Sequence, residues 1–143
     1  MADIIKLAKH APWGKIPIIG NRLPKGFYFV GDPAFILHRN DWDAFLAAFY
    51  AVSDDAAIFN FKGRKCFVSS TNRGAGIYYD RGGTKYSAPS GLIGVVPHLV
   101  TSDTGFTNRL STGGFFPLPF HVGADPGHGK FKRIRIGNCI IDT

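Results

Sequence analysis

Large apolar residues recur at helical spacing in one stretch of the chain, residues 41–52. The residues concerned are Trp42, Phe45, Leu46 and Phe49. Positions i, i+3, i+4 and i+7 fall on one face of an α-helix, so this face is predicted to pack on a sheet. Asn40 is the predicted N-cap, because its short side chain can accept a hydrogen bond from a free backbone N–H. A shorter amphipathic helix is predicted over residues 3–11, ending at Pro12.

The rest of the chain consists of short apolar runs separated by Gly, Pro, Asn and Asp, a pattern typical of strands and tight turns. Strands are predicted over residues 16–19, 27–30, 34–37, 57–61, 64–70, 77–79, 84–87, 92–96, 106–110, 115–122, 130–136 and 139–142. Hairpin turns are predicted at Lys62-Gly63, at residues 80–83 and at Gly137-Asn138. We expect residues 12–26 to form an extended arm. Residues 98–129 are predicted to be largely irregular and to lie over the outside of the fold.

The predicted fold class is α+β, mainly β: a twisted antiparallel sheet or sandwich packed on one helix at about 41–52, with an extended N-terminal arm. The 143 residues include 18 Gly and 9 Pro but no Glu and no Gln, which disfavours helices, while 13 Phe and 5 Tyr favour strands. The length suits a single domain, 1–143. It is divided into a basic arm (1–26), a core (27–97) and a loop-rich extension ending in a basic hairpin (98–143).

The net charge of +7 is concentrated in the two ends of the sequence. Residues 1–26 carry five basic residues against one Asp, and residues 130–143 carry four against one. The candidate interaction residues are Lys6, Lys9, Lys15, Arg22, Lys25, Lys130, Lys132, Arg133 and Arg135. They indicate either a docking surface for an acidic protein or nucleic acid, or ordinary solvated surface. For residues 130–136 a further alternative is an edge strand whose charges prevent aggregation.

Asp32, within Gly31-Asp32-Pro33, is the candidate for chemistry, although an Asp in this setting is more typical of a residue that caps its own turn. His121, Asp125 and His128 are the weaker alternative of a metal site in a Gly-rich loop. Neither pattern is specific enough to assign, so the sequence predicts no catalytic residue, metal or cofactor. Cys66 and Cys139 lie in apolar runs and are predicted to be free thiols, with a disulfide as the alternative.

A set of short motifs is spread over residues 27–97. They are Phe27-Tyr28-Phe29-Val30-Gly31-Asp32-Pro33, Phe35-Ile36-Leu37, Trp42, Ser70-Thr71, Gly74, Gly76, Tyr78, Ser90-Gly91 and Ile93-Gly94. In these motifs the stretch resembles a family of small, largely uncharacterised proteins common in bacteriophages and prophages, in which Gly-Asp-Pro is followed by Cys-Tyr-Val. Ala34, Ala75 and Pro89 stand where that family has Cys, Asp and Asp. If those carboxylates act in catalysis in the family, their loss here implies a scaffold used for binding or assembly.

The resemblance, the missing carboxylates and the Gly- and Pro-rich extensions together favour a non-enzymatic phage structural protein, a small virion-associated subunit of the capsid cement or decoration type or a tail-associated one. Two alternatives stay open: an accessory protein that binds and inhibits a host factor, and a nucleic-acid-binding protein that uses its basic termini. The expected partners are proteins, either further copies of this chain or phage coat or tail subunits. The sequence shows no apolar stretch that would serve as a secretory signal or membrane span, so we expect assembly in the host cytoplasm and residence in the virion.

Overall fold

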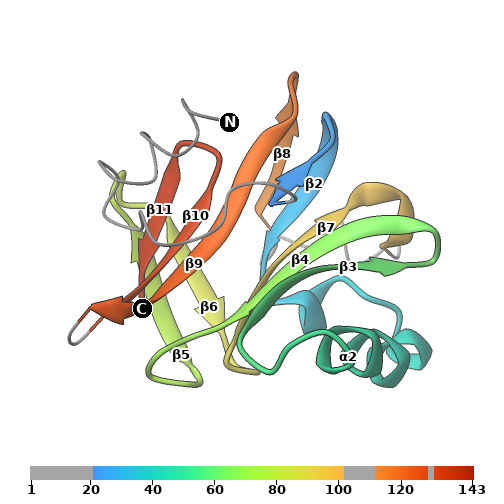
Figure 1. Ribbon diagram of the computed structural model, residues 1–143, viewed down its shortest axis with the longest axis horizontal. Coiled ribbons are helices and arrows are strands. Elements are labelled where there is room, and N and C mark those ends of the chain that lie inside the picture. Colours follow the sequence, from blue (N-terminus) through green and yellow to red (C-terminus); the bar gives the residue numbers. More distant parts are fainter. Residues whose placement is uncertain (1–20, 102–111, 129–130) are drawn as a thin grey trace.

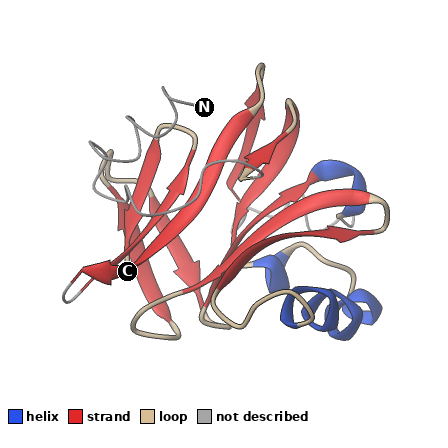
Figure 2. Cartoon of the chain, viewed as in Figure 1, coloured by secondary structure: helices blue, strands red, loops and turns tan. Residues whose placement is uncertain are grey.

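The computed structural model describes residues 21–101, 112–128 and 131–143, and the strands within them form two antiparallel sheets (Figures 1 and 2). The six-stranded sheet has the order β1 (Arg22–Leu23), β9 (Phe120–His128), β10 (Phe131–Ile136), β11 (Cys139–Asp142), β5 (Gly76–Asp80), β6 (Lys85–Ala88). The five-stranded sheet has the order β3 (Ala56–Phe61), β4 (Arg64–Ser70), β7 (Leu92–Pro97), β2 (Gly26–Gly31), β8 (Thr112–Phe116). The predicted mainly β fold is confirmed, in its sandwich form.

The two sheets pack face to face over the larger of two hydrophobic clusters. Side chains of successive strand residues point to opposite faces. In β2, Tyr28 and Val30 therefore enter the core between the sheets, whereas Phe29 lies on the outer face. In the six-stranded sheet, Val122 of β9 and Ile134 of β10 enter the same core and are fully buried.

Helix α2 (Trp42–Tyr50) covers the β3–β4 part of the outer face of the five-stranded sheet (Figure 1). Its Phe45 and Phe49 are fully buried, and both rings pack against Phe59 of β3, with centroid distances of 5.1 and 5.8 Å. Trp42 and Leu46 pack at the edge of this cluster. The apolar stripe predicted by the helical spacing is confirmed, and it anchors the helix.

The start of this helix differs from the prediction. A 3-10 turn, η2 (Arg39–Asp41), precedes α2, and its cap is His38, whose Nδ1 accepts a hydrogen bond from the Asn40 N–H at 3.2 Å. Asn40 is therefore inside a turn, and its prediction as N-cap is wrong. The turn capped by His38 begins before Asn40, and α2 itself begins after Asp41, which makes no side-chain capping bond.

The predicted strand at 34–37 is also wrong, because η1 (Pro33–Phe35) is a 3-10 turn. Asp32 accepts a hydrogen bond from the Ala34 N–H at 2.9 Å, and Pro33 fixes the first residue of the turn, so the backbone leaves the sheet after Gly31.

Residues 98–129 are more regular than predicted. After η3 (His98–Val100), the described part contains β8 and the long strand β9, which pairs with both β1 and β10 inside the six-stranded sheet. Phe120, Val122 and Ala124 alternate into the core, although Gly123 and the following Pro126-Gly127 give this segment the composition of a loop. The predictions for residues 1–20 and 106–110, including Lys6, Lys9 and Lys15, lie outside the described residues, as does Lys130.

The three predicted hairpins are confirmed as β3–β4, β5–β6 and β10–β11. Within the described residues, no helix has the length and apolar character needed to cross a membrane.

Candidate interaction surface

The carboxylate of Asp32 is completely buried and bonded within the fold. Besides capping η1, its Oδ2 accepts the Ser90 N–H at 2.7 Å and its Oδ1 accepts the Ser90 hydroxyl at 2.8 Å. These bonds join the end of β2 to the turn between β6 and β7, 58 residues further along the chain. The interpretation of Asp32 as a turn cap is confirmed, and the residue also links two segments.

Several of the short-motif residues between positions 27 and 97 contact one another around this link. Position 94 must be glycine here, since a Cβ on it would lie 2.7 Å from Cγ of Pro33. Thr71 binds the Gly91 carbonyl through its N–H at 3.0 Å, and the hydroxyl of Tyr78 donates to the Gly74 carbonyl at 2.6 Å. The motifs thus have a structural account: they hold β2, the 71–74 turn and the β6–β7 turn together.

The basic candidates divide into buried and exposed groups. Lys132 is buried, and its ammonium donates to Asp55 Oδ1 at 2.6 Å and to Ser70 Oγ at 2.9 Å, so it does not belong to an interaction surface. The carboxylate of Asp55 and the hydroxyl of Ser70 compensate the buried ammonium, so its charge is used within the fold. Arg133 is half-buried and pairs with Asp142 at 3.4 Å.

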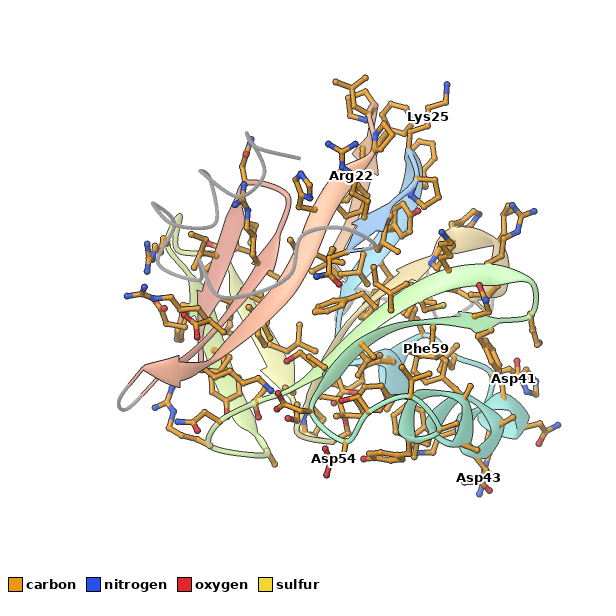
Figure 3. All side chains as sticks on the ribbon, in the orientation of Figure 1. Arg22, Lys25, Asp41, Asp43, Asp54 and Phe59 are labelled. Atoms are coloured by element: carbon orange, nitrogen blue, oxygen red, sulfur yellow. The ribbon has the colours of Figure 1, made fainter. Side chains whose placement is uncertain are left out.

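Arg22 and Lys25 are exposed and lie at the same end of the molecule, where β2 begins and β8 ends (Figure 3). We call this end the tip. Three large apolar side chains lie at this end: Phe27, Phe115 and Leu99, which are 57, 56 and 69% exposed. The rings of Phe27 and Phe115, from neighbouring strands, have their centroids 4.7 Å apart. Grouped apolar side chains of this size are typical of interaction sites.

A hollow of about 280 Å³ lies beside Phe27. Its walls include Leu99, and its rim carries Lys25, Arg64 and Lys65, which are all exposed. Asp41, Asp43 and Asp54 lie around α2, away from Arg22 and Lys25 (Figure 3). Lys62 pairs with Asp41 at 2.7 Å, so the exposed acidic side chains at the helix end are those of Asp43 and Asp54.

A larger pocket of about 560 Å³ lies between the β8–β9 turn and the β10–β11 turn. Phe116 and Phe120 form one wall as a parallel stack, with centroids 3.9 Å apart and ring planes inclined by 16°. Tyr86 and Cys139 form the inner wall, and both bond to Asp80, the tyrosine hydroxyl at 3.0 Å and the thiol at 3.4 Å.

His121 of β9 lies at the rim of this pocket between two arginines. Arg22 of β1 approaches His121 Nε2 at 3.4 Å, and Arg135 of β10 also lines the pocket while its Nε donates to the Gly137 carbonyl. Burial, and then the charges of Arg22 and Arg135, lower the pKa of His121 below 6.5. The structure thus brings two of the basic candidates from opposite ends of the sequence together around one imidazole. Only the strand order β1-β9-β10 reveals this, and no signal in the sequence does.

The side chain of His128, part of the metal alternative, lies outside the described residues, and among those described no three His, Cys or Asp side chains gather closely enough to hold an ion. Asp125 is buried on β9. Both cysteines are free, as predicted, which excludes the alternative of a disulfide. Burial raises the pKa of the Cys66 thiol to about 12 and that of the Cys139 thiol to about 11, so both are protonated at neutral pH.

Comparison of the chain with protein-family models, with curated proteins and with solved structures gives no match.

Proposed function

We propose that this protein is a non-enzymatic structural subunit of a phage particle, and that it assembles with protein partners through its tip. The grouping of Phe27, Phe115 and Leu99 at a basic end of the sandwich carries the proposal. Apolar side chains give a contact its affinity, and the surrounding charges select the partner and its orientation. The resemblance to phage and prophage proteins supports the phage context.

The partner that fits this surface presents apolar and acidic side chains together. The chain itself presents such a surface at the end of α2, where Tyr50 and Val52 are exposed beside the exposed Asp54. A second copy of the chain therefore fits the tip in a head-to-tail contact, and an acidic phage coat or tail subunit fits it equally. Head-to-tail contacts build rings or filaments rather than closed dimers.

The experiment compares two double variants that remove the same kinds of side chain from different places. Lys25→Glu with Phe27→Ser changes the tip. Lys85→Glu with Tyr79→Ser is the matched control, because Tyr79 pairs with Lys85 on β5–β6 and is 56% exposed, like Phe27. We expect the tip variant alone to lose self-association in sedimentation velocity and to disappear from purified particles analysed by mass spectrometry.

Copy number in purified particles tests the phage assignment separately. Tens to hundreds of copies would identify a lattice subunit, and a handful would place it at a portal, tail or vertex. Absence from particles would contradict the structural role and favour the accessory protein, whose host partner a pull-down from host lysate would then recover.

Nucleic acid is a second candidate partner, favoured by one observation. The exposed ring pair Phe27–Phe115 lies beside Lys25 and Lys65, an arrangement in which bases stack and phosphates pair. Fluorescence anisotropy with a labelled thymidine oligonucleotide tests it. Binding that weakens with salt and fails in Phe27→Ser supports this candidate, and no binding at low salt rejects it.

A further inference from the structure

We propose that the hollow at the tip binds an acidic peptide segment of a partner protein and takes up one aromatic side chain of that segment. This inference rests on the proposed function, because it names the chemistry of the partner that docks at the tip. The hollow lies where the start of β2 meets the end of β7, and its volume is about 280 Å³. Sites that enclose a whole small molecule typically measure about 300–1,000 Å³, so this hollow suits a single bulky side chain.

The walls of the hollow are apolar and held in place by the fold. Pro24 and Pro97 both line it, and the ring of each proline fixes one backbone torsion. The buried Tyr28 lies opposite Pro97 in the β2–β7 pairing and donates its hydroxyl to the Pro24 carbonyl at 2.6 Å. Its polar atom is therefore satisfied within the wall. Walls of this kind lose little conformational freedom when a partner binds, which favours affinity.

The exposed apolar side chains beside the hollow favour an aromatic occupant. Phe27 and Leu99 line the hollow and are each more than half exposed, so a partner can bury their apolar area. A ring seated against Phe27 adds an aromatic contact to this burial. Tyrosine and tryptophan are also the residues that most often anchor protein interfaces in small pockets.

The charges around the hollow favour acidic residues on the peptide next to the aromatic one. Lys25, Arg64 and Lys65 line the hollow and are exposed. Within the described part of the chain none of the three has an acidic partner, whereas Lys62, in the β3–β4 turn, pairs with Asp41. The described lining also contains no acidic side chain. Three uncompensated positive charges attract a segment that carries carboxylates and orient it on the surface.

A peptide fits this place better than nucleic acid does. Successive bases of a single strand stack with their planes nearly parallel, and aromatic platforms for them present faces that follow this order. The rings of Phe27 and Phe115 are inclined by 46° to each other, so two bases stacked on them would not be parallel. The geometry therefore favours one inserted side chain over a run of stacked bases.

Isothermal titration calorimetry of the intact protein with three matched peptides tests the proposal. The first peptide is Gly-Asp-Asp-Trp-Asp-Asp-Gly. The second has Ser in place of Trp, and the third has Asn in place of every Asp. We expect the first peptide to bind at least about tenfold more tightly than either of the others, because only it supplies both the anchor and the charges. Added salt should weaken its binding.

Two single variants locate the binding at the hollow. Leu99→Ser removes an apolar wall and Lys25→Glu reverses a charge, and each is expected to weaken binding of the first peptide by at least about tenfold. Leu118→Ser and Lys85→Glu are the matched controls and should leave binding unchanged. Leu118 is 71% exposed, close to the 69% of Leu99, Lys85 is exposed like Lys25, and neither control residue lines the hollow.

The proposal is overturned if the first peptide does not bind, if either matched peptide binds as tightly, or if the control variants weaken binding as much as the hollow variants. Tighter binding of a thymidine oligonucleotide at the same salt concentration would also overturn it. Loss of the tip variant from particles without peptide binding would reject this inference and leave the proposed function standing. Peptide binding by a protein whose tip variant stays in particles would support this inference and reject the proposed function.

Discussion

At the scale of single residues, several polar side chains that attract attention in the sequence serve the fold. Asp32 is the clearest case, because its carboxylate accepts three hydrogen bonds while completely buried. The sequence predicted the bond to its own turn, since that bond is local. It could not predict the bonds from Ser90, which depend on how β2 and the β6–β7 turn meet in space.

We expect Asp32→Ala to destabilise the protein strongly. The change leaves the N–H groups of Ala34 and Ser90 without their acceptor in a buried place, which costs about 2–4 kcal/mol in the free energy of unfolding. Urea unfolding followed by circular dichroism measures the effect. Asp54→Ala, at an exposed aspartate, is the control and should change the free energy by less than about 0.5 kcal/mol. A similar value for both variants would contradict the role assigned to Asp32.

At the scale of elements, the sequence predicted best what depends on neighbours along the chain. The hairpins β3–β4, β5–β6 and β10–β11 and the helix α2 follow from turn residues and periodicity within about a dozen residues. Strand β9 was predicted only in part, because its Gly and Pro residues suggest a loop until its partners β1 and β10 are known. The position of Lys132 was misjudged for the same reason, since its partner Asp55 is 77 residues away.

The Lys132–Asp55 pair links β10 to the segment before β3, and its two partners are not equivalent. Lys132 is buried, whereas the Asp55 side chain is 47% exposed. Asp55→Ala leaves the buried ammonium without its carboxylate partner. This change is expected to cost about 2 kcal/mol in the free energy of unfolding. Lys132→Met removes the buried charge and keeps the packing of the aliphatic stem, so its cost should be smaller. Urea unfolding of the two single variants decides the order, and a larger loss in Lys132→Met would contradict it.

At the scale of the whole molecule, the basic and apolar tip lies away from the exposed acidic residues Asp43 and Asp54 around α2 (Figure 3). Composition and net charge revealed the excess of basic residues but not its place, because the strand order decides which of them remain exposed. The pocket beside His121 could not be predicted either. Its walls come from segments around residues 30, 86, 116–121 and 135–139.

Global stability is expected to fall in two separate ranges of pH. The pKa of His121 in the folded protein lies below 6.5, so this imidazole is protonated more readily in the unfolded chain. The stability that it contributes is therefore present above pH 6.5 and is lost as the pH falls below 6.5. Burial of the Asp80 carboxyl works in the opposite direction, but hydrogen bonds from Thr84, Tyr86, Cys139 and Gly82 outweigh it and lower its pKa below 3.8. The stability that Asp80 contributes is therefore lost only below pH 3.8.

Urea unfolding at a series of pH values measures both losses. His121→Asn has no titrating group at this position and should remove the first loss while leaving the second. An unchanged profile near pH 6 in this variant would show that other groups cause the decline.

The pairing of β2 also has a consequence for the synthesis of the chain. Its neighbours β7 and β8 begin at residues 92 and 112, so the aromatic strand Phe27–Val30 leaves the ribosome long before either neighbour exists. At roughly 5–20 residues per second, this delay lasts several seconds. During that time a strand with three aromatic residues has only chaperones, or other nascent chains, to cover it. The yield of soluble protein should therefore depend on the rate of translation and the supply of chaperones more than on the stability of the finished fold.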